Sequence, residues 1–311
     1  MIILTSSTNL TNLLDTECLS KNQLENIFNL AKHYKENKDL DLKQTFPNKT
    51  IGFLFYEPST RTKGSFYQAS SKLGLNILDF SPSTSSVVKG ESLIDTAKNL
   101  IALGVDLFIL RHNQAGSSQF LSKYIDKPVI NAGDGMHAHP TQALLDAFTL
   151  VEIYNSLEKK KIAIIGDIRH SRVARSNIYT LKTLGAEVTL VGPSTFIPEE
   201  AEKLGVKVTN NIEEILNYDA IMALRIQKER QLSGYIPSLS EYFKFYGLKD
   251  KHLSKIKENA LIMHPGPMNR GVEISSKVAN SEKSIILQQV ENGVYIRMAI
   301  IAILLGGENN E

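Results

Sequence analysis

Arginine, histidine and hydroxyl side chains gather at short intervals along this 311-residue sequence. The clusters are EPSTRT at 57–62, RH at 111–112, GDGMHAH at 133–139, DIRHSR at 167–172, Arg225 with Gln227 and Arg230, and HPGP at 264–267. Arginine itself is scarce, since only nine of the 35 basic residues are arginines. A planar, permanently charged guanidinium grips carboxylates and phosphates through paired hydrogen bonds. Arginines concentrated in these clusters therefore predict the binding of anionic ligands.

The segment PSTRT has the features of a phosphate site. Ser59 is a good N-cap residue, and apolar residues then follow at helical spacing until Gly74. Free backbone N–H groups, three hydroxyls and Arg61 would meet at the positive end of a helix dipole. Such caps are common, but Arg111 at a neighbouring strand end strengthens the prediction that a phosphate binds here.

The second half of the chain favours a different anion. Arg172 stands at the first turn of a predicted helix, and Arg225 with Gln227 follows an apolar run. Separate guanidinium groups and an amide suit a small dicarboxylate, because each carboxylate can take its own bidentate partner. The sequence thus predicts two bound anions, one in each half.

Other chemistries fit the sequence poorly. Only Gly166 is present where a dinucleotide loop needs three glycines, and no G-x-S-x-G elbow presents a serine nucleophile. His137 and His139 have no third metal ligand nearby in the sequence, and the single Cys18 excludes an internal disulfide, a C-x-x-C pair and a four-cysteine zinc site. We therefore expect no cofactor and no metal.

Composition sets the class of protein. Hydrophobic residues make up 42% and charged residues 22% of the chain, which is ordinary for a globular protein, and a net charge of +2 argues against a nucleic-acid binder. No stretch has the roughly 18 unbroken apolar residues of a membrane helix. The start, MIILTSSTNLTN, lacks the basic region of a secretory signal. We expect a soluble, cytoplasmic protein without a membrane partner.

Continuous apolar runs of strand length alternate with amphipathic helical stretches, which predicts an α/β protein with parallel sheets. The length exceeds the usual limit of one core, so we expect two doubly wound parallel-sheet domains joined by helices. The expected domains are 1–148 and 149–289, with a C-terminal helix at 290–306 that packs back on the first. The predicted strands, four in each domain, are 51–55, 76–80, 105–110, 128–132, 161–166, 187–192, 219–224 and 260–264.

Two helices have particular roles in this arrangement. A helix that begins at Pro140 is expected to join the domains, because proline suits a first helical position and apolar residues recur behind it. The last helix is expected to form over 294–305, after a turn at Asn292-Gly293.

The series FYEPSTRT, SSVVKGES, RHNQAG, HPTQALLD, GDIRHSR, RIQKER and HPGPMNRG, in this order, resembles the motifs of the aspartate/ornithine carbamoyltransferase family. STRT and HPTQ are shared by both branches. Ornithine enzymes typically carry HCLP where this chain has HPGP at 264–267, and they lack RIQKER, so the aspartate branch is favoured. The alternatives are a transferase for ornithine or another amino acid, and a catalytically silent homologue that serves as a scaffold.

The resemblance implies roles for particular residues. It implies that carbamoyl phosphate is held by Ser59, Thr60, Arg61, Thr62, Arg111, His139, Gln142, Gly266 and Pro267. It implies that aspartate is held by Ser85, Lys89, Arg172, Arg225 and Gln227. The catalytic residues would be Arg61, Thr62, Lys89, Arg111 and His139.

The resemblance also implies an assembly and a mechanism. The loop with Ser85 and Lys89 reaches a neighbouring subunit's site in this family, so a homotrimer with shared active sites is expected. Some members carry a second basic residue before this lysine, whereas here Val88 leaves Lys89 as the loop's only cation. The aspartate amine would attack the carbamoyl carbon without a covalent enzyme intermediate. Whether a regulatory chain or a dihydroorotase joins the trimer stays open.

Overall fold

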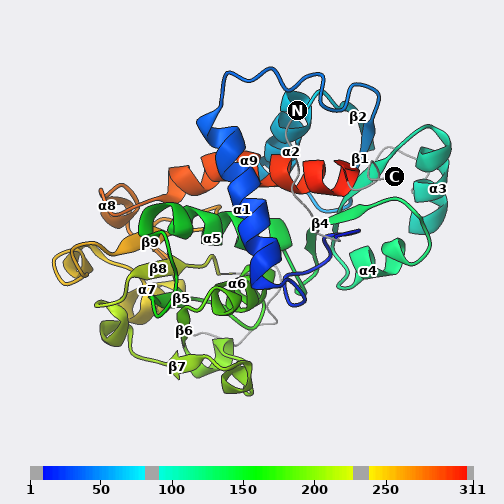
Figure 1. Cartoon of the computed structure of the whole chain (residues 1–311). Helices are drawn as coiled ribbons and strands as arrows, with labels where there is room; N and C mark the ends of the chain where they lie inside the picture. The colour runs from blue at the N-terminus through cyan, green and yellow to red at the C-terminus, as the bar shows by residue number, and fades with distance from the viewer. Residues whose placement is uncertain (1–9, 81–90, 227–237, 307–311) are drawn as a thin grey trace. The chain divides into compact units, whose positions relative to one another are not determined.

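The computed structural model describes residues 10–80, 91–226 and 238–306, and the chain divides into two compact units (Figure 1). Unit 1 comprises residues 1–141 and 292–311, and unit 2 comprises residues 142–291. The division falls between Thr141 and Gln142, inside helix α5 (Pro140–Tyr154), and again between Glu291 and Asn292, inside helix α9 (Ile286–Gly306).

Unit 1 is built on a parallel sheet of four strands in the order β2-β1-β3-β4. Its apolar core lies between the sheet and helices α3 and α4, where Leu54, Leu100 and Phe108 are buried together. Gly52 is needed in β1, since a Cβ there would stand 2.9 Å from Val105 Cγ1. The elements are α1 (Lys21–Glu36), β1 (Thr50–Phe55), α2 (Thr60–Lys72), β2 (Asn76–Phe80), α3 (Leu93–Ala102), β3 (Leu107–His112), α4 (Ser117–Ser122) and β4 (Val129–Asp134).

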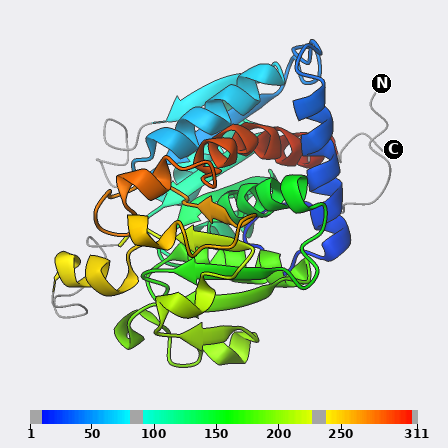
Figure 2. The ribbon, with the colours of Figure 1, turned by 90° about the vertical axis from the view of Figure 1, so that its left-hand side faces the viewer.

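Unit 2 is built on a parallel sheet of five strands in the order β7-β6-β5-β8-β9, with flanking helices (Figure 2). Ala163, Ile221 and Ile262, from three neighbouring strands, lie in one buried cluster. The strands and α-helices are β5 (Lys161–Ile165), α6 (Arg172–Thr183), β6 (Glu187–Val191), β7 (Lys207–Thr209), β8 (Ala220–Ala223), α7 (Leu239–Tyr246), β9 (Leu261–Met263) and α8 (Ser276–Ala279). Short 3-10 helices lie at Ser194–Phe196, Ala201–Leu204, Ile212–Ile215 and Asp250–His252.

Serine caps set the start of several helices. Helices α1, α2, α3 and α6 each begin directly after a serine whose Oγ accepts a backbone N–H from the first turn, at 3.1 to 3.4 Å. Such caps satisfy donors that have no partner within the helix. The predicted start of the helix after Ser59 is confirmed.

The predicted parallel α/β class is confirmed, but two element predictions are wrong. The second sheet has a fifth strand, β7, at its edge. The three residues of β7 are exposed or half-exposed, so the strand has no buried apolar run by which the sequence could predict it. The last helix begins at Ile286 and continues through Asn292 and Gly293, where a turn was predicted. A glycine inside a helix costs about 1 kcal/mol relative to alanine. Contacts of the neighbouring residues offset this cost, and one of them is the hydrogen bond from Lys35 Nζ to Asn292 Oδ1 at 2.7 Å.

Helix α9, red in Figure 1, is long and apolar enough to cross a membrane by length and composition alone. Most of its apolar stretch, 78%, is buried inside the structure, as in the core helix of a globular protein. Within unit 1 it packs on α2, where the Arg297 guanidinium lies 4.9 Å from the Phe66 ring centre and donates to Ser65 Oγ at 3.0 Å.

Candidate active site

The start of α2 has the geometry predicted for an anion site. Ser59 is extended (φ −161°, ψ 101°), and its Oγ accepts the N–H of Thr62 at 3.4 Å. Thr62 is buried, whereas the side chains of Thr60 and Arg61 are exposed. The 13-residue helix directs its positive end toward this turn, so backbone N–H groups and a guanidinium are available to an anion.

Arg111 lies near the start of α2, at the carboxyl-terminal end of β3 in the first sheet. It pairs in register with Phe55, the last residue of β1, so it stands beside the strand that leads into α2. The residue is 8% exposed, and its guanidinium donates to Glu57 Oε1 at 2.7 Å and to Ala132 O at 3.0 Å. These two acceptors fix the plane of the guanidinium, and Glu57 is a positioning residue that the sequence analysis did not assign.

His139 ends a loop that follows β4 and is itself buried. The fully buried carboxylate of Asp134 organises this loop by accepting hydrogen bonds from Gly116 N at 2.7 Å, Ala138 N at 3.1 Å and Asn131 Nδ2 at 2.8 Å. Three donors from two segments of chain hold the loop in one shape. Asp134 therefore fixes the backbone as far as Ala138, the residue before His139.

A second histidine lies near this edge without a role assigned from the sequence. His112 ends β3, and its Nδ1 accepts the backbone N–H of Gln114 at 3.0 Å. Burial lowers the pKa of His112, and the nearby carboxylates of Asp134 and Glu57 only partly oppose that shift. The ring is therefore expected to be neutral at neutral pH.

In unit 2, the loop from Gly166 to Ser171 leads into α6. Gly166 has a φ of 138°, and a Cβ there would come within 2.9 Å of Leu224 Cβ, so the loop needs glycine at this position. Ser171 caps the helix, and Arg172, its first residue, is only 4% exposed. Asp167 and His170 form a buried pair at 2.7 Å that braces the turn before Arg172.

The other predicted residues of unit 2 follow the ends of neighbouring strands. Arg225 comes two residues after β8 and is half-buried. Gly266 and Pro267 follow β9 and are joined by a cis peptide bond. Strands β8 and β9 are parallel neighbours, so these residues lie at the same end of the sheet, where the strands end. Three predicted residues, Ser85, Lys89 and Gln227, lie outside the described part of the chain.

Arg169 differs from the other arginines of its segment. Its guanidinium donates to Ile197 O at 3.0 Å, and its backbone N–H donates to Phe196 O at 2.8 Å. The side chain thus holds the segment after β6 in place. Arg169 of the DIRHSR cluster therefore has a structural role.

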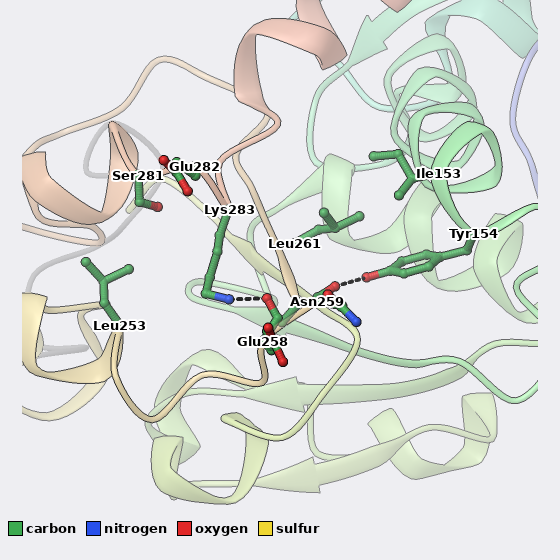
Figure 3. A pocket seen from close by; sticks show the side chains of 10 residues that line it. Ile153, Tyr154, Leu253, Glu258, Asn259, Leu261, Ser281, Glu282 and Lys283 are labelled. Carbon is green, nitrogen blue, oxygen red and sulfur yellow. Dashed lines mark hydrogen bonds between the residues drawn. The ribbon is translucent and has the colours of Figure 1, made fainter.

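A pocket of about 830 Å³ lies at the opposite edge of the second sheet, among residues that the sequence analysis did not single out (Figure 3). Tyr154, Asn259 and Lys283 contribute to its lining, and the Tyr154 hydroxyl lies 2.9 Å from Asn259 O and 2.6 Å from Asp219 O. Burial and the charge of Asp219 raise the pKa of this phenol. The pocket lies at the amino-terminal ends of β8 and β9, away from the strand ends that carry Arg225 and Gly266.

Within residues 10–80, 91–226 and 238–306, no three His, Cys, Asp or Glu side chains are grouped as metal ligands would be. The chemistry that the described residues offer is the binding of anions by guanidinium groups, helix N-termini and hydroxyls.

Comparisons with known proteins agree with this chemistry. The family model for the carbamoyl-phosphate-binding domain of aspartate/ornithine carbamoyltransferases matches residues 11–152, and the model for the Asp/Orn-binding domain matches residues 158–304. The aspartate carbamoyltransferase catalytic subunit of Desulfitobacterium hafniense (strain DSM 10664 / DCB-2) is 51% identical over 298 residues, which cover 95% of this chain and 96% of that protein. The catalytic subunit from Acetivibrio thermocellus is 50% identical over 305 residues, or 96% and 97% of the two chains.

Solved structures agree as well. Aspartate transcarbamoylase from Trypanosoma cruzi, in complex with carbamoyl aspartate and phosphate, is 28% identical with a TM-score of 0.85 and covers 94% of each chain. The resemblance inferred from the motifs is thus confirmed over nearly the whole chain. With both domain models matched in succession, the chain belongs to the aspartate/ornithine carbamoyltransferase family.

Proposed function

We propose that this protein transfers the carbamoyl group of carbamoyl phosphate to the amine of L-aspartate, giving N-carbamoyl-L-aspartate and phosphate, a step of pyrimidine biosynthesis. The observation that carries the proposal is the pair of anion-binding constellations, one at the strand ends of each unit. Relatives of about 50% identity are aspartate carbamoyltransferases, and the Trypanosoma cruzi enzyme has been solved with carbamoyl phosphate and aspartate together.

In the proposed reaction, the aspartate nitrogen attacks the carbamoyl carbon, and a C–N bond replaces the bond from that carbon to the phosphate oxygen. Phosphate leaves with the electron pair, and the amine loses a proton. Thr62, Arg111 and His139 donate hydrogen bonds to the carbonyl oxygen as its negative charge grows. Each such donor commonly contributes about 3 to 4 kcal/mol to stabilisation of the transition state.

Binding is divided among the remaining residues. Ser59, Thr60 and Arg61 hold the phosphate at the start of α2. Gln142, Gly266 and Pro267 contact the carbamoyl group. Arg172 and Arg225, with Gln227, hold the two carboxylates of aspartate. Most of the rate enhancement then comes from holding the two substrates in reacting orientation, since no covalent intermediate is needed.

The proposed assembly is a cytoplasmic homotrimer in which Ser85 and Lys89 of one subunit serve the neighbour's site. The support is the family resemblance and the composition of the loop, which lies outside the described residues. Sedimentation of the purified chain tests the trimer, and fractionation of the source cells tests the compartment.

The proposed activity has a direct assay. Purified protein is supplied with carbamoyl phosphate and L-aspartate, phosphate release is followed, and the organic product is identified by mass spectrometry. Release that requires aspartate, with an equal amount of N-carbamoyl-aspartate formed, is expected. Release with ornithine but not with aspartate would favour the other branch of the family, and no carbamoylated product with either would favour a silent scaffold.

A further inference from the structure

Asp146, in the middle of α5, lies at the centre of a buried hydrogen-bond network in unit 2. Its side chain is fully buried and accepts an amide N–H from each of three residues on three helices. Oδ1 accepts from Gln142 Nε2 at 2.9 Å and from Gln289 Nε2 at 2.7 Å, and Oδ2 accepts from Asn177 Nδ2 at 2.9 Å. Gln142 precedes Asp146 by one helical turn, while Asn177 and Gln289 belong to α6 and α9.

A carboxylate can only accept hydrogen bonds, so Asp146 decides which way each amide faces. The nitrogen of Gln142 turns toward Asp146, and its Oε1 is the end left for other partners. Phosphate oxygens are acceptors and cannot donate to Oε1, whereas the NH₂ of a carbamoyl group is a donor. The orientation of Gln142 therefore suits the carbamoyl end of the substrate and not the phosphate end.

A second branch of the network leads to the turn after β9. Gln289 Oε1 accepts the backbone N–H of His264 at 3.1 Å, so both ends of the Gln289 amide are engaged. His264 is buried, and its Nδ1 accepts the N–H of Gly266 at 2.8 Å. Nε2 of the same ring must then carry the proton, which it donates to buried Glu273 Oε1 at 3.1 Å.

The two branches end at residues that the proposed function places against one chemical group. One branch orients Gln142, and the other holds the backbone of Gly266 and Pro267, all three of which are proposed to contact the carbamoyl group. We propose that Asp146 is a positioning residue that sets the selectivity for a carbamoyl NH₂ through both branches. This inference rests on the proposed function, because it assumes that carbamoyl phosphate is the substrate.

Acetyl phosphate is a suitable probe, since it replaces the NH₂ of carbamoyl phosphate with a methyl group and keeps the rest. The test measures the dissociation constants of both compounds for the full chain by calorimetry in the absence of aspartate. Wild type is expected to prefer carbamoyl phosphate by about tenfold or more, as hydrogen bonds to the NH₂ would give. In Asp146→Asn the preference should fall to about threefold or less, while acetyl phosphate affinity stays within about twofold.

Asp219→Asn is the matched control. Asp219 is also a buried carboxylate of unit 2, but it precedes β8 at the opposite edge of the sheet, where it accepts from Lys161 N at 2.9 Å. Its substitution should lower stability and leave the preference unchanged. If Asp146→Asn does not fold, Gln289→Met removes the second branch with little change in volume and should also reduce the preference.

The outcomes separate two failures. Wild type that carbamoylates neither aspartate nor ornithine overturns the proposed function. Active wild type without a preference for carbamoyl phosphate, or a folded Asp146→Asn variant that retains the preference, overturns only the role of Asp146. Equal weakening of both ligands in Asp146→Asn would also overturn it, because that is the signature of a purely structural residue.

Discussion

Arg61 and Arg111 illustrate two ways in which an arginine can serve an anion site. Arg111 is buried and already oriented by Glu57 and Ala132, so little side-chain entropy is lost when a ligand binds. Arg61 is exposed at the positive end of α2, where its long side chain can follow the ligand. In the proposed site, Arg111 would orient the ligand, and Arg61 would supply positive charge at the phosphate.

Replacement of Arg61 by alanine is expected to reduce turnover by at least about a hundredfold, because it removes both charge neutralisation and charge-assisted hydrogen bonds from the phosphate. The fold should persist, since the side chain is exposed. Arg61→Lys should rescue poorly, because a point charge cannot reproduce the planar fork. Steady-state kinetics and circular dichroism check this, with exposed Arg175 replaced by alanine as the control. Activity of Arg61→Ala within tenfold of wild type would refute the role.

Arg225→Ala is expected to separate the two substrates. The aspartate KM should rise and kcat should fall, each by about tenfold or more, because a bidentate partner of one carboxylate is lost. Carbamoyl phosphate affinity, measured by calorimetry without aspartate, should stay within about twofold. A comparable loss of carbamoyl phosphate affinity would show that Arg225 does not belong to the aspartate side.

The sequence predicts the backbone geometry of the candidate site well where that geometry is local. Ser59 and the hydroxyls after it could be read from one segment, because an N-cap and its helix are adjacent in the chain. Asp146 had a signal that could have been used, since it lies four residues after Gln142 on one helix face. Gln289 had none, because its partner is 143 positions away and only the folded chain brings the two side chains together.

At the scale of elements, parallel strands were predicted better than the irregular segments between them. Central strands are continuous apolar runs, and their burial keeps the pattern clear. The edge strand β7 lacks that signal, because it has only three residues and none of them is buried. Helix α9 shows the opposite error, because a Gly293 that predicts a turn locally is overridden by packing along the whole helix.

The segment that includes His252 is expected to make the free energy of unfolding depend on pH. His252 is fully buried, its Nδ1 accepts the N–H of Lys249 at 3.1 Å, and burial together with nearby Lys251 lowers its pKa to about 4. The unfolded chain binds this proton near pH 6.5. Stability from the neutral ring is therefore complete above about pH 6.5 and is lost as pH falls toward 4, by about 3 kcal/mol in total.

His252→Gln is expected to remove that acid-side loss. Denaturant unfolding of both proteins, repeated from pH 7.5 to 4, gives the difference in unfolding free energy at each pH. The difference should change steadily between pH 6.5 and 4 and stay flat above 7. A difference that is constant across the range would show that His252 is not the titrating group.

At the scale of the whole molecule, each unit carries its own set of candidate anion-binding residues, and the proposed function assigns carbamoyl phosphate mainly to one set and aspartate to the other. In the proposed trimer, Lys89 would serve the site of a neighbouring subunit, as the family resemblance implies. The segment that carries Lys89 contains only serine, threonine and proline from 81 to 86, and this composition does not say which subunit's site it would serve.

Shared sites predict complementation between inactive chains. Lys89→Ala and Arg61→Ala proteins, each nearly inactive alone, should regain activity after they are dissociated, mixed and reassembled. Mixed trimers then contain some sites with both residues intact. If mass spectrometry demonstrates mixed trimers and activity still does not return, each site is built from one chain.

The identity of the amino-acid substrate tests the proposed function most directly. The protein is supplied with ¹³C-labelled carbamoyl phosphate and equal concentrations of L-aspartate and L-ornithine, and the labelled products are followed by NMR. Nearly all of the transferred label should appear in N-carbamoyl-L-aspartate, and Arg225→Ala should slow its formation. Label that accumulates mainly in carbamoylated ornithine, or in neither amino acid, would contradict the assignment of this chain as an aspartate carbamoyltransferase.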